Sequence, residues 1–378
     1  MDQYKKPAGI MANINDVMAP EYRELWNDKI QQKIDQDIEA NRKADACIAL
    51  NHVQPGTEIK VEQISHDFIF GAHIFNYEQL GSREVNDRYK DLFGDLFNSA
   101  TIAFYWKTLE PEEGYVRYQG EYRDSAEFWN KVKEPKKEPH WRRPAPDPVV
   151  DFCLSKGIRL HGHTLTWGNT KWQYPDWLVR KLPERFWQNL QFPMDNGSGW
   201  ELAGYFENYT EDEIQQLIPD YIRTLNEKMC SRIQDIALRY KDKIHSWDIC
   251  NESAADFERN NMIPASAVTK SVYGLMSGDY TYRSFKMADA FFPKSVKLNI
   301  NDYHLGQPYV DQIDDLQKRG CKIDIMGAQM HLFNPQTCLD IADGISDSWV
   351  QNPKRIWETM NRLSQAELPI HLSEITIT

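Results

Sequence analysis

Two glutamates, Glu252 and Glu374, lie in apolar, β-rich runs of the sequence, IHSWDICNE (244–252) and LPIHLSEITIT (368–378). A carboxyl group in such a run is costly to bury unless it is paired. Hydrolysis of a glycosidic bond requires two facing carboxyl groups, because one protonates the leaving oxygen while the other attacks the anomeric carbon or activates water. We therefore take these two glutamates as candidate catalytic residues.

Further polar residues stand near the ends of other β-rich runs. They are Asn251, next to Glu252; His161, His163 and Trp167 in the run 158–167; Asn301, Asp302 and Tyr303 at the end of 296–303; and Gln329 and His331 at the end of 324–331. In a barrel of parallel strands the active site lies at the carboxyl ends of the strands, so we expect these side chains to converge. Asn251 is placed to bind a sugar 2-hydroxyl, a contact that strengthens in the transition state.

The elements that would position these residues are short apolar runs, which alternate along the chain with long helical segments. The runs span 66–75, 99–106, 158–167, 244–252, 296–303, 324–331 and 368–378. Strands that alternate with helices indicate βαβ units and a parallel sheet. Seven such units favour an α/β fold of the (β/α)₈ TIM-barrel class over a doubly wound sheet, and no glycine-rich phosphate loop follows the first run.

The segment before the first run has a different character. A charged helix is predicted over 22–43, followed by β-rich stretches at 46–50 and 58–64 around a turn at Gln54-Pro55-Gly56. We therefore expect a helical extension at 1–45 and one catalytic barrel over 46–378.

Two long segments interrupt the barrel rhythm, a charged, proline-rich insertion at 124–148 and a polar, aromatic loop at 170–210. After the second, Thr210 and Glu213 can form a capping box. Apolar residues then recur at helical spacing as far as Ile236, which predicts a long helix before the fourth run.

Composition narrows the class of protein. The 378 residues carry a formal charge of -12, which disfavours binding to nucleic acid or to anionic membranes. No apolar run approaches the roughly 20 residues that span a bilayer. The six cysteines have no metal-ligand spacing, and the histidines of the candidate site have carboxylate and amide neighbours rather than ligand spacing, so no metal site is expected. No cofactor is expected either. Aromatic residues make up 12% of the chain, and although most are expected in the core, some can pack against sugar rings.

These residues carry a family resemblance that runs from about Ala44 to Thr378. The chain resembles glycoside hydrolase family 10, the family of β-1,4-xylanases. The shared motifs, in order, are HDFIFG, EPEEG at 110–114, HGHTLTW, RYKDKIHSWDICNE, KLNINDY, GAQMH and SEI. The Asn-Glu pair after Trp-Asp is the most specific of them.

The resemblance implies a role for each matching residue. Glu252 matches the general acid/base and Glu374 the nucleophile of a retaining endo-β-1,4-xylanase that acts on xylan or arabinoxylan by double displacement. His331 matches the histidine that hydrogen-bonds the nucleophile, Gln329 the glutamine beside it, and Asn251 the ligand of the sugar 2-hydroxyl. His163 and Trp167 match residues that line the sugar site, Tyr303 resembles the aromatic on the leaving-group side, and Trp106 aligns with a substrate-binding tryptophan.

The chain departs from the family pattern after the second strand. Aligning Trp106 and Glu110-Pro111 places Thr101, Ile102 and Tyr105 where members have the Glu, Asn and Lys that bind the distal sugar. Thr376 stands where members have an aspartate that orients the histidine matched by His331. We therefore expect a reshaped distal glycone subsite and a weaker support for that histidine.

Two further expectations concern the ends of the sequence. It stops four residues after Glu374, so the eighth strand and helix are expected to be lacking, with weak activity and association through open strand edges as consequences. The second chain in such an association could complete the barrel. The N-terminus lacks the apolar stretch of a signal peptide, whereas the substrate predicts a secreted or periplasmic protein.

Two alternatives stay open at this point. The chain could be a related barrel glycosidase that acts on another β-linked plant polysaccharide, which the departures at Thr101, Ile102 and Tyr105 favour. It could also be a non-catalytic carbohydrate-binding fragment, which the expected lack of an eighth strand favours.

Overall fold

A computed structural model describes residues 28–47, 49–62, 66–138, 142–331 and 353–376. The chain divides into two compact units. One comprises residues 1–67, 334–352 and 378, and the other comprises 68–333 and 353–377. All the candidate site residues belong to the second unit.

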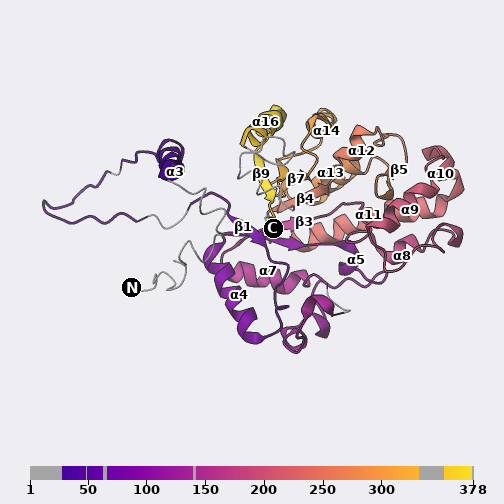
Figure 1. The fold of residues 1–378 in the computed structure, drawn as a ribbon, viewed down its shortest axis with the longest axis horizontal. Coiled ribbons are helices and arrows are strands. Elements are labelled where there is room, and N and C mark those ends of the chain that lie inside the picture. Colours follow the sequence, from indigo (N-terminus) through magenta and orange to yellow (C-terminus); the bar gives the residue numbers. More distant parts are fainter. Residues whose placement is uncertain (1–27, 48, 63–65, 139–141, 332–352, 377–378) are drawn as a thin grey trace. The chain divides into compact units, whose positions relative to one another are not determined.

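The second unit is built on a parallel sheet (Figure 1) in the order β1-β2-β3-β4-β7-β8-β9. Its strands are β1 Gly71–His73, β2 Ser99–Ala103, β3 Arg159–His163, β4 Ser246–Asn251, β7 Lys297–Asp302, β8 Ile325–Gln329 and β9 Ile370–Glu374. Each lies within one of the seven apolar runs, so the predicted βαβ rhythm is confirmed. Among the described residues, β1 and β9 are the two edges of this sheet.

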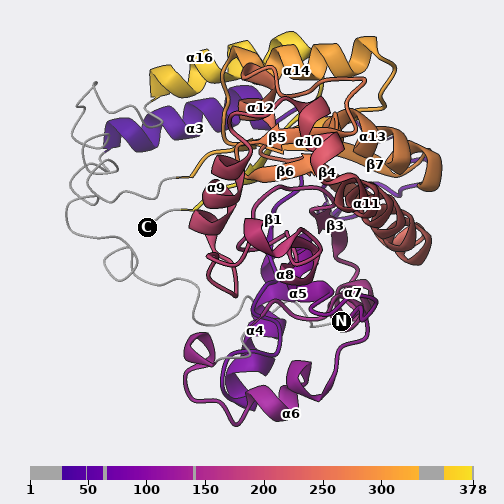
Figure 2. The same ribbon diagram turned by 90° about the vertical axis from the view of Figure 1, so that its right-hand side faces the viewer.

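Helices lie between the strands along the chain, and several of them flank the sheet (Figure 2). They are α4 Arg83–Leu96, α5 Trp106–Leu109, α6 Ala126–Trp129, α7 Pro146–Ser155, α8 Asp176–Val179, α9 Asn196–Tyr205, α10 Glu211–Leu217, α11 Pro219–Tyr240, α12 Ala254–Glu258, α13 Tyr280–Phe291, α14 Gln307–Lys318 and α16 Pro353–Leu363. Helix α7 packs on β2 and β3, while α13 packs on β4 and β7. The result is the sheet-and-helix layering of an α/β barrel. No helix in this described part is long and apolar enough to cross a bilayer.

The main hydrophobic core lies between the strands and these helices. It includes Leu160, Trp247 and Ile300 from the strands, with Ile236 of α11 and Ile313 of α14, and each of these five is at most 1% exposed. A second apolar cluster fills the space among α8, α9, α10, α11 and the hairpin of β5 (Val268–Ser271) and β6 (Gly274–Ser277). This second cluster supports the loops that follow β3 and β4.

The predicted capping box is confirmed, but the helix after it is not continuous. Thr210 and Glu213 bond each other's backbone N–H groups at the start of α10. The helix then ends at Leu217, and α11 begins at Pro219, with Ile218 between them in a non-helical conformation. Proline has no N–H to donate and disfavours a helical residue before it, so it starts a new helix here.

Several other local expectations need correction. The described residues of 46–50 and 58–64 form no strand, although the turn is present, with the Thr57 N–H bonded to the Gln54 carbonyl. The loop 170–210 contains α8, α9 and a 3₁₀ turn, and the insertion 124–148 contains α6 and the start of α7. The antiparallel β5–β6 hairpin was not predicted at all.

The first unit is described only in part. Its helix α3 spans Asp28–Arg42, within the predicted 22–43, whose first six residues lie outside the described ranges. This helix is largely polar, and Lys33 and Asp37 form an i,i+4 ion pair at 2.9 Å. Such pairs contribute only a few tenths of a kcal/mol each.

Candidate active site

Glu252 directly follows β4, at the carboxyl end of the sheet. Its backbone has a φ of +56°, in the left-handed region that non-glycine residues rarely adopt, and its N–H donates to the Asn301 carbonyl at 2.8 Å. Strained backbone of this kind persists where the surrounding structure enforces it, and it clusters at functional sites. The carboxyl oxygen Oε2 accepts hydrogen bonds from the Trp167 indole N–H and the Tyr273 hydroxyl, both at 3.0 Å.

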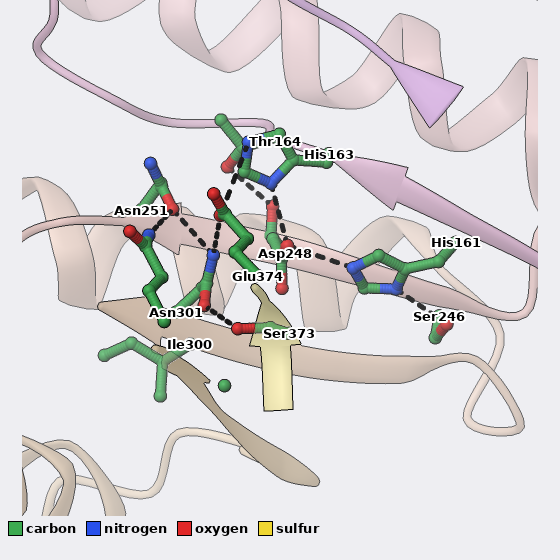
Figure 3. A network of polar contacts seen from close by, with 12 residues as sticks. His161, His163, Thr164, Ser246, Asp248, Asn251, Ile300, Asn301, Ser373 and Glu374 are labelled. Atoms are coloured by element: carbon green, nitrogen blue, oxygen red, sulfur yellow. Dashed lines mark hydrogen bonds and ion pairs between the residues drawn. The ribbon is translucent and has the colours of Figure 1, made fainter. Parts of the chain in front are cut away.

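Glu374 ends β9 and faces the interior of the site (Figure 3). Its Oε1 accepts a hydrogen bond from Asn301 Nδ2 at 2.6 Å, and its Oε2 lies 3.4 Å from His331 Nε2. His163 Nε2 lies 4.0 Å from Oε1. The side chain is 32% exposed, so substrate can reach the carboxyl group.

A chain of amide side chains links the two glutamates. Gln329 Nε2 lies 3.4 Å from Glu252 Oε1 and donates to Asn251 Oδ1 at 3.1 Å. Asn301 donates to the same Asn251 oxygen at 2.9 Å and to Glu374. Asn251, Asn301 and Gln329 come from β4, β7 and β8, so three neighbouring strands contribute to one network.

Asn301 needs space beneath it, which Gly327 of β8 supplies. A β-carbon at Gly327 would lie 2.5 Å from Asn301 Oδ1 and 3.0 Å from Ser373 Oγ. The Ser373 hydroxyl donates to that same Asn301 oxygen at 2.5 Å. Any side chain at position 327 would therefore push Asn301 away from both Asn251 and Glu374.

Behind Glu374, two histidines of β3 share one buried aspartate of β4. Asp248 Oδ2 lies 2.9 Å from His163 Nδ1 and 3.0 Å from His161 Nε2, and His161 Nδ1 contacts the Ser246 hydroxyl at 2.9 Å. Burial would raise the pKa of Asp248, but the two histidines hold it well below its usual value. Burial would lower the pKa of His163, but Asp248 and Glu374 raise it above its usual value.

The surroundings give the two glutamates opposite protonation preferences. Burial, together with the negative charges of Glu374 and Asp302, raises the pKa of Glu252 to about 7, although hydrogen bonds from Tyr273 and Gln329 oppose the rise. Burial would also raise the pKa of Glu374, but the His331 hydrogen bond and the His163 charge hold it below its usual value. Near neutral pH, one carboxyl can therefore donate a proton while the other is ionised.

A pocket of about 290 Å³ lies at this end of the sheet. Its lining includes Phe75, Tyr105, His163, Asp248, His331 and Glu374. In the described part of the chain, no group of three or more His, Cys, Asp or Glu residues is arranged to hold a metal ion.

The remaining predicted site residues have different placements. Trp167 is 9% exposed and contacts Glu252 directly, and Tyr303 is 54% exposed beyond the end of β7. Trp106 does not reach the pocket. It is 4% exposed, packs in the second apolar cluster, and its indole N–H donates to Glu110 at 2.7 Å. Its apolar surface and its one polar atom are both used inside the protein.

The departures after β2 give this side of the pocket an aromatic character. Tyr105 packs 5.9 Å from Phe75 and 5.7 Å from Trp172, measured between ring centroids. The Arg143 guanidinium, from the proline-rich insertion, lies over the Phe75 ring at 4.6 Å. Lys107 does not replace the missing lysine, because its ammonium group bonds Asp176 at 2.7 Å and two backbone carbonyls.

Asn301 lies at the site as expected, but no role was predicted for it, and Asp248 and Tyr273 were not predicted at all. Asp248 carries the signal of a polar side chain inside a buried strand, which also identified Asn251. Tyr273 lies in the unpredicted β5–β6 hairpin, whose turn residues Val272 and Tyr273 are not the glycine, asparagine or aspartate typical of hairpin turns.

Comparison with known sequences now identifies the family. The sequence profile of glycosyl hydrolase family 10 matches residues 62–378. The chain belongs to this family. The expected (β/α)₈ barrel class is thereby confirmed, and the described residues supply seven strands of its parallel sheet.

Individual relatives are distant. The endo-1,4-beta-xylanase/feruloyl esterase of Xylanibacter ruminicola is 22% identical over 301 residues, which are 76% of this chain and 34% of that protein. Endo-1,4-beta-xylanase A of a Caldicellulosiruptor species is 28% identical over 238 residues, which are 61% of this chain and 28% of that protein. The chain thus spans about a third or less of the length of these curated relatives.

Solved structures of the family are also similar to this chain. One is described as the structure of GH10 from Paenibacillus barcinonensis and is 20% identical to it, with a TM-score of 0.48. The match covers 82% of this chain and 70% of that one.

Proposed function

We propose that this family 10 chain hydrolyses internal β-1,4-xylosidic bonds of xylan or arabinoxylan with retention of configuration. The observation that supports this most is the pair of glutamates at the ends of β4 and β9, joined through Gln329, Asn251 and Asn301 and tuned to opposite protonation states. A retaining mechanism needs one protonated and one ionised carboxyl group, about 5–5.5 Å apart.

In the first step Glu374 attacks the anomeric carbon, and Glu252 gives its proton to the glycosidic oxygen as the bond to that oxygen breaks. In the second step Glu252 takes a proton from water, which displaces Glu374 from the sugar. Asn251 Oδ1 already accepts from Asn301 and Gln329, so its NH₂ group is the part that donates to a sugar hydroxyl. His331 and His163 stabilise the ionised Glu374 between turnovers.

Stereochemistry tests the mechanism. Proton NMR of xylohexaose hydrolysis should show the β-anomer of the new reducing end first, with the α-anomer appearing only by mutarotation. Early appearance of the α-anomer would instead mean an inverting reaction.

Azide rescue assigns the two roles. With a dinitrophenyl xylobioside, Glu374→Ala plus azide should yield the α-glycosyl azide, because azide replaces the nucleophile directly. Glu252→Ala plus azide should yield the β-glycosyl azide, because azide then intercepts the intermediate on Glu374. The reverse pattern of products would exchange the two assignments.

A second candidate substrate is another β-linked plant polysaccharide. Tyr105 favours it, because it stands where family members have a lysine that binds the distal sugar, and its ring packs with Phe75 and Trp172 instead. A panel of xylan, arabinoxylan, cellulose and mannan distinguishes the candidates, and we expect the highest kcat/KM on the two xylans.

We also infer a secreted or periplasmic location for the activity, because a polymeric substrate cannot cross a membrane. Fractionation of the source cells, followed by detection of the protein with an antibody, tests this inference. Finding the protein only in the cytoplasm would contradict it.

A further inference from the structure

The β5–β6 hairpin brings a tyrosine to the candidate acid/base. Its strands pair from Val268↔Ser277 to Ser271↔Gly274, so Val272 and Tyr273 form the turn. The Tyr273 hydroxyl lies 3.0 Å from Glu252 Oε2, the same oxygen that the Trp167 indole N–H contacts at 3.0 Å. One oxygen of the carboxyl group thus has two hydrogen-bond donors, while Oε1 has only the long 3.4 Å contact with Gln329 among the described residues.

A buried carboxylate fixes the position of this turn. Asp256 of α12, four residues after Glu252, is 0% exposed. It accepts hydrogen bonds from the Val272 N–H at 2.7 Å, the Ser271 hydroxyl at 2.5 Å and the Tyr280 hydroxyl at 2.8 Å. Charge-assisted bonds of this kind are about twice as strong as neutral ones. The short segment from Glu252 to Asp256 therefore both carries the candidate acid/base and binds the turn that contains Tyr273.

Close packing fixes the ring as well. A β-carbon at Gly168, the residue after Trp167, would lie 3.0 Å from the Tyr273 β-carbon and 3.1 Å from its Cδ2 atom. The absence of a side chain at Gly168 lets the two donors of Glu252 Oε2 approach from adjacent segments. Tyr273 also packs against the cluster of Phe75, Tyr105 and Trp167.

We propose that Tyr273 is a positioning residue for Glu252, which together with Trp167 occupies Oε2 and leaves the transferable proton on Oε1. The indole N–H can only donate, so Oε2 serves as an acceptor. During glycosidic cleavage the Oε1 proton passes to the leaving oxygen, which keeps the electron pair of the broken bond, and the negative charge left on Glu252 is stabilised by Tyr273. In the second step Oε1 takes the proton back from water. This proposal rests on the proposed function of Glu252.

Other titratable groups also face Glu252 and have to be kept constant in a test. They are Glu374 on β9, Asp302 and Tyr303 at the end of β7, His163 on β3, and Tyr105 after β2. Tyr273→Phe leaves all of them in place and removes only one oxygen atom. An effect of this variant on titration therefore reports on the contact between Tyr273 and Glu252.

The first test is kinetic. Tyr273→Phe should lower kcat on xylohexaose roughly tenfold, the effect of losing one hydrogen bond to a charged group. It should leave kcat/KM for a dinitrophenyl xylobioside within about twofold, because kcat/KM reports the first step and that leaving group departs without a proton. Tyr209→Phe, at a tyrosine that is 42% exposed, is the matched control and should change neither rate. Equal losses on both substrates, or no loss on either, would overturn the proposal.

The second test does not require activity. Carbon NMR of δ-¹³C-glutamate-labelled protein should show the titration of Glu252 about half to one pH unit higher in Tyr273→Phe than in the unaltered chain. Asp256→Asn, which weakens the support of the turn, should shift it in the same direction. An unchanged titration in Tyr273→Phe, in protein shown by circular dichroism to be folded, would refute the coupling. If the unaltered chain cleaves neither substrate, the proposed function fails, and this titration still decides whether Tyr273 acts on Glu252.

Discussion

Strands β4 and β9 carry the two candidate carboxyl groups, and they hold them in different ways. β4 pairs on both sides, with β3 and β7, and its last five residues are buried. Among the described residues β9 pairs only with β8, and its Leu372 is 53% exposed. Glu252 thus follows a central strand and Glu374 ends an edge strand.

The difference shows what each glutamate depends on. Glu252 is fixed by its own backbone, which bonds the Asn301 carbonyl, and by two donors from loops that follow β3 and β4. Glu374 is fixed through its side chain, by Asn301 of β7 and by His331 after β8. Side chains from neighbouring segments therefore position Glu374 on the edge strand, whereas burial and backbone pairing position Glu252 after the central strand.

Removing each carboxyl group gives the largest expected effect. Glu374→Gln should lower turnover by on the order of 10⁴-fold or more on every substrate, because no covalent intermediate can form. Glu252→Gln should lower kcat/KM about 10²–10⁴-fold on xylohexaose but little on a dinitrophenyl xylobioside, because kcat/KM reports the first step and dinitrophenolate leaves without a proton. Steady-state kinetics on both substrates measures this difference. If both variants lost the same activity on each of the two substrates, the roles would not be divided as proposed.

The next largest effect concerns the support of Glu374. Asn301→Ala removes the hydrogen bonds to Glu374 and Asn251, and should lower kcat roughly 10- to 100-fold, as expected for bonds to a charged group. Asn361→Ala, at an exposed position of α16, is the control and should have no effect. A loss below about threefold in Asn301→Ala would mean that β9 holds its carboxyl group unaided.

A smaller effect is expected at Thr376, which replaces the family's aspartate. Its hydroxyl lies 3.2 Å from His331 Nδ1, so it orients the histidine that contacts Glu374. Thr376→Val should lower kcat about fivefold, the effect of one neutral hydrogen bond, while Thr376→Ser should retain activity. If both variants behaved alike, the hydroxyl would have no part in orienting His331.

The smallest effect is on stability and concerns Glu252. Its pKa of about 7 in the folded protein exceeds the value of about 4.3 expected in the unfolded chain. The unfolded chain therefore loses its proton first, and this group makes the protein less stable as pH rises from about 4.5 to 7. Glu252→Gln removes that dependence, so it should raise the melting temperature by a few degrees more at pH 8 than at pH 5. Calorimetry at both pH values measures the difference, and an equal shift at the two would contradict it.

The strands and the site were predictable because the sequence repeats one pattern, a short apolar run with polar residues at or near its end. Each of the seven strands is a short apolar run, and Asn251, Glu252, Gln329 and Glu374 are polar residues in or directly after such runs. Because the active site of such a barrel lies at the carboxyl ends of its parallel strands, the strand assignment alone predicts that these four residues lie close together.

The failures occur where tertiary packing overrides the local pattern. Trp106 aligns with a substrate-binding tryptophan of the family, yet the second apolar cluster buries it. The hairpin that carries Tyr273 is held by Asp256, a long-range contact that sequence spacing does not show. The stretches at 46–50 and 58–64 have β-prone composition, but a short hairpin alone is only marginally stable. Pro219 marks the helix break at Ile218 in the sequence itself, because proline disfavours a helical residue before it.

Gly327 has a consequence for how this sequence can vary. It lies on the buried strand β8, and the space of its missing side chain is taken by Asn301 and Ser373. Glycine to alanine is among the smallest of all substitutions, and in a strand it normally favours folding. In a deep mutational scan, position 327 should therefore separate two properties, with alanine variants expressed in normal amounts and yet unable to support growth on the polysaccharide. A screen for protein abundance alone would therefore accept alanine at position 327, whereas a screen for catalytic activity would retain glycine.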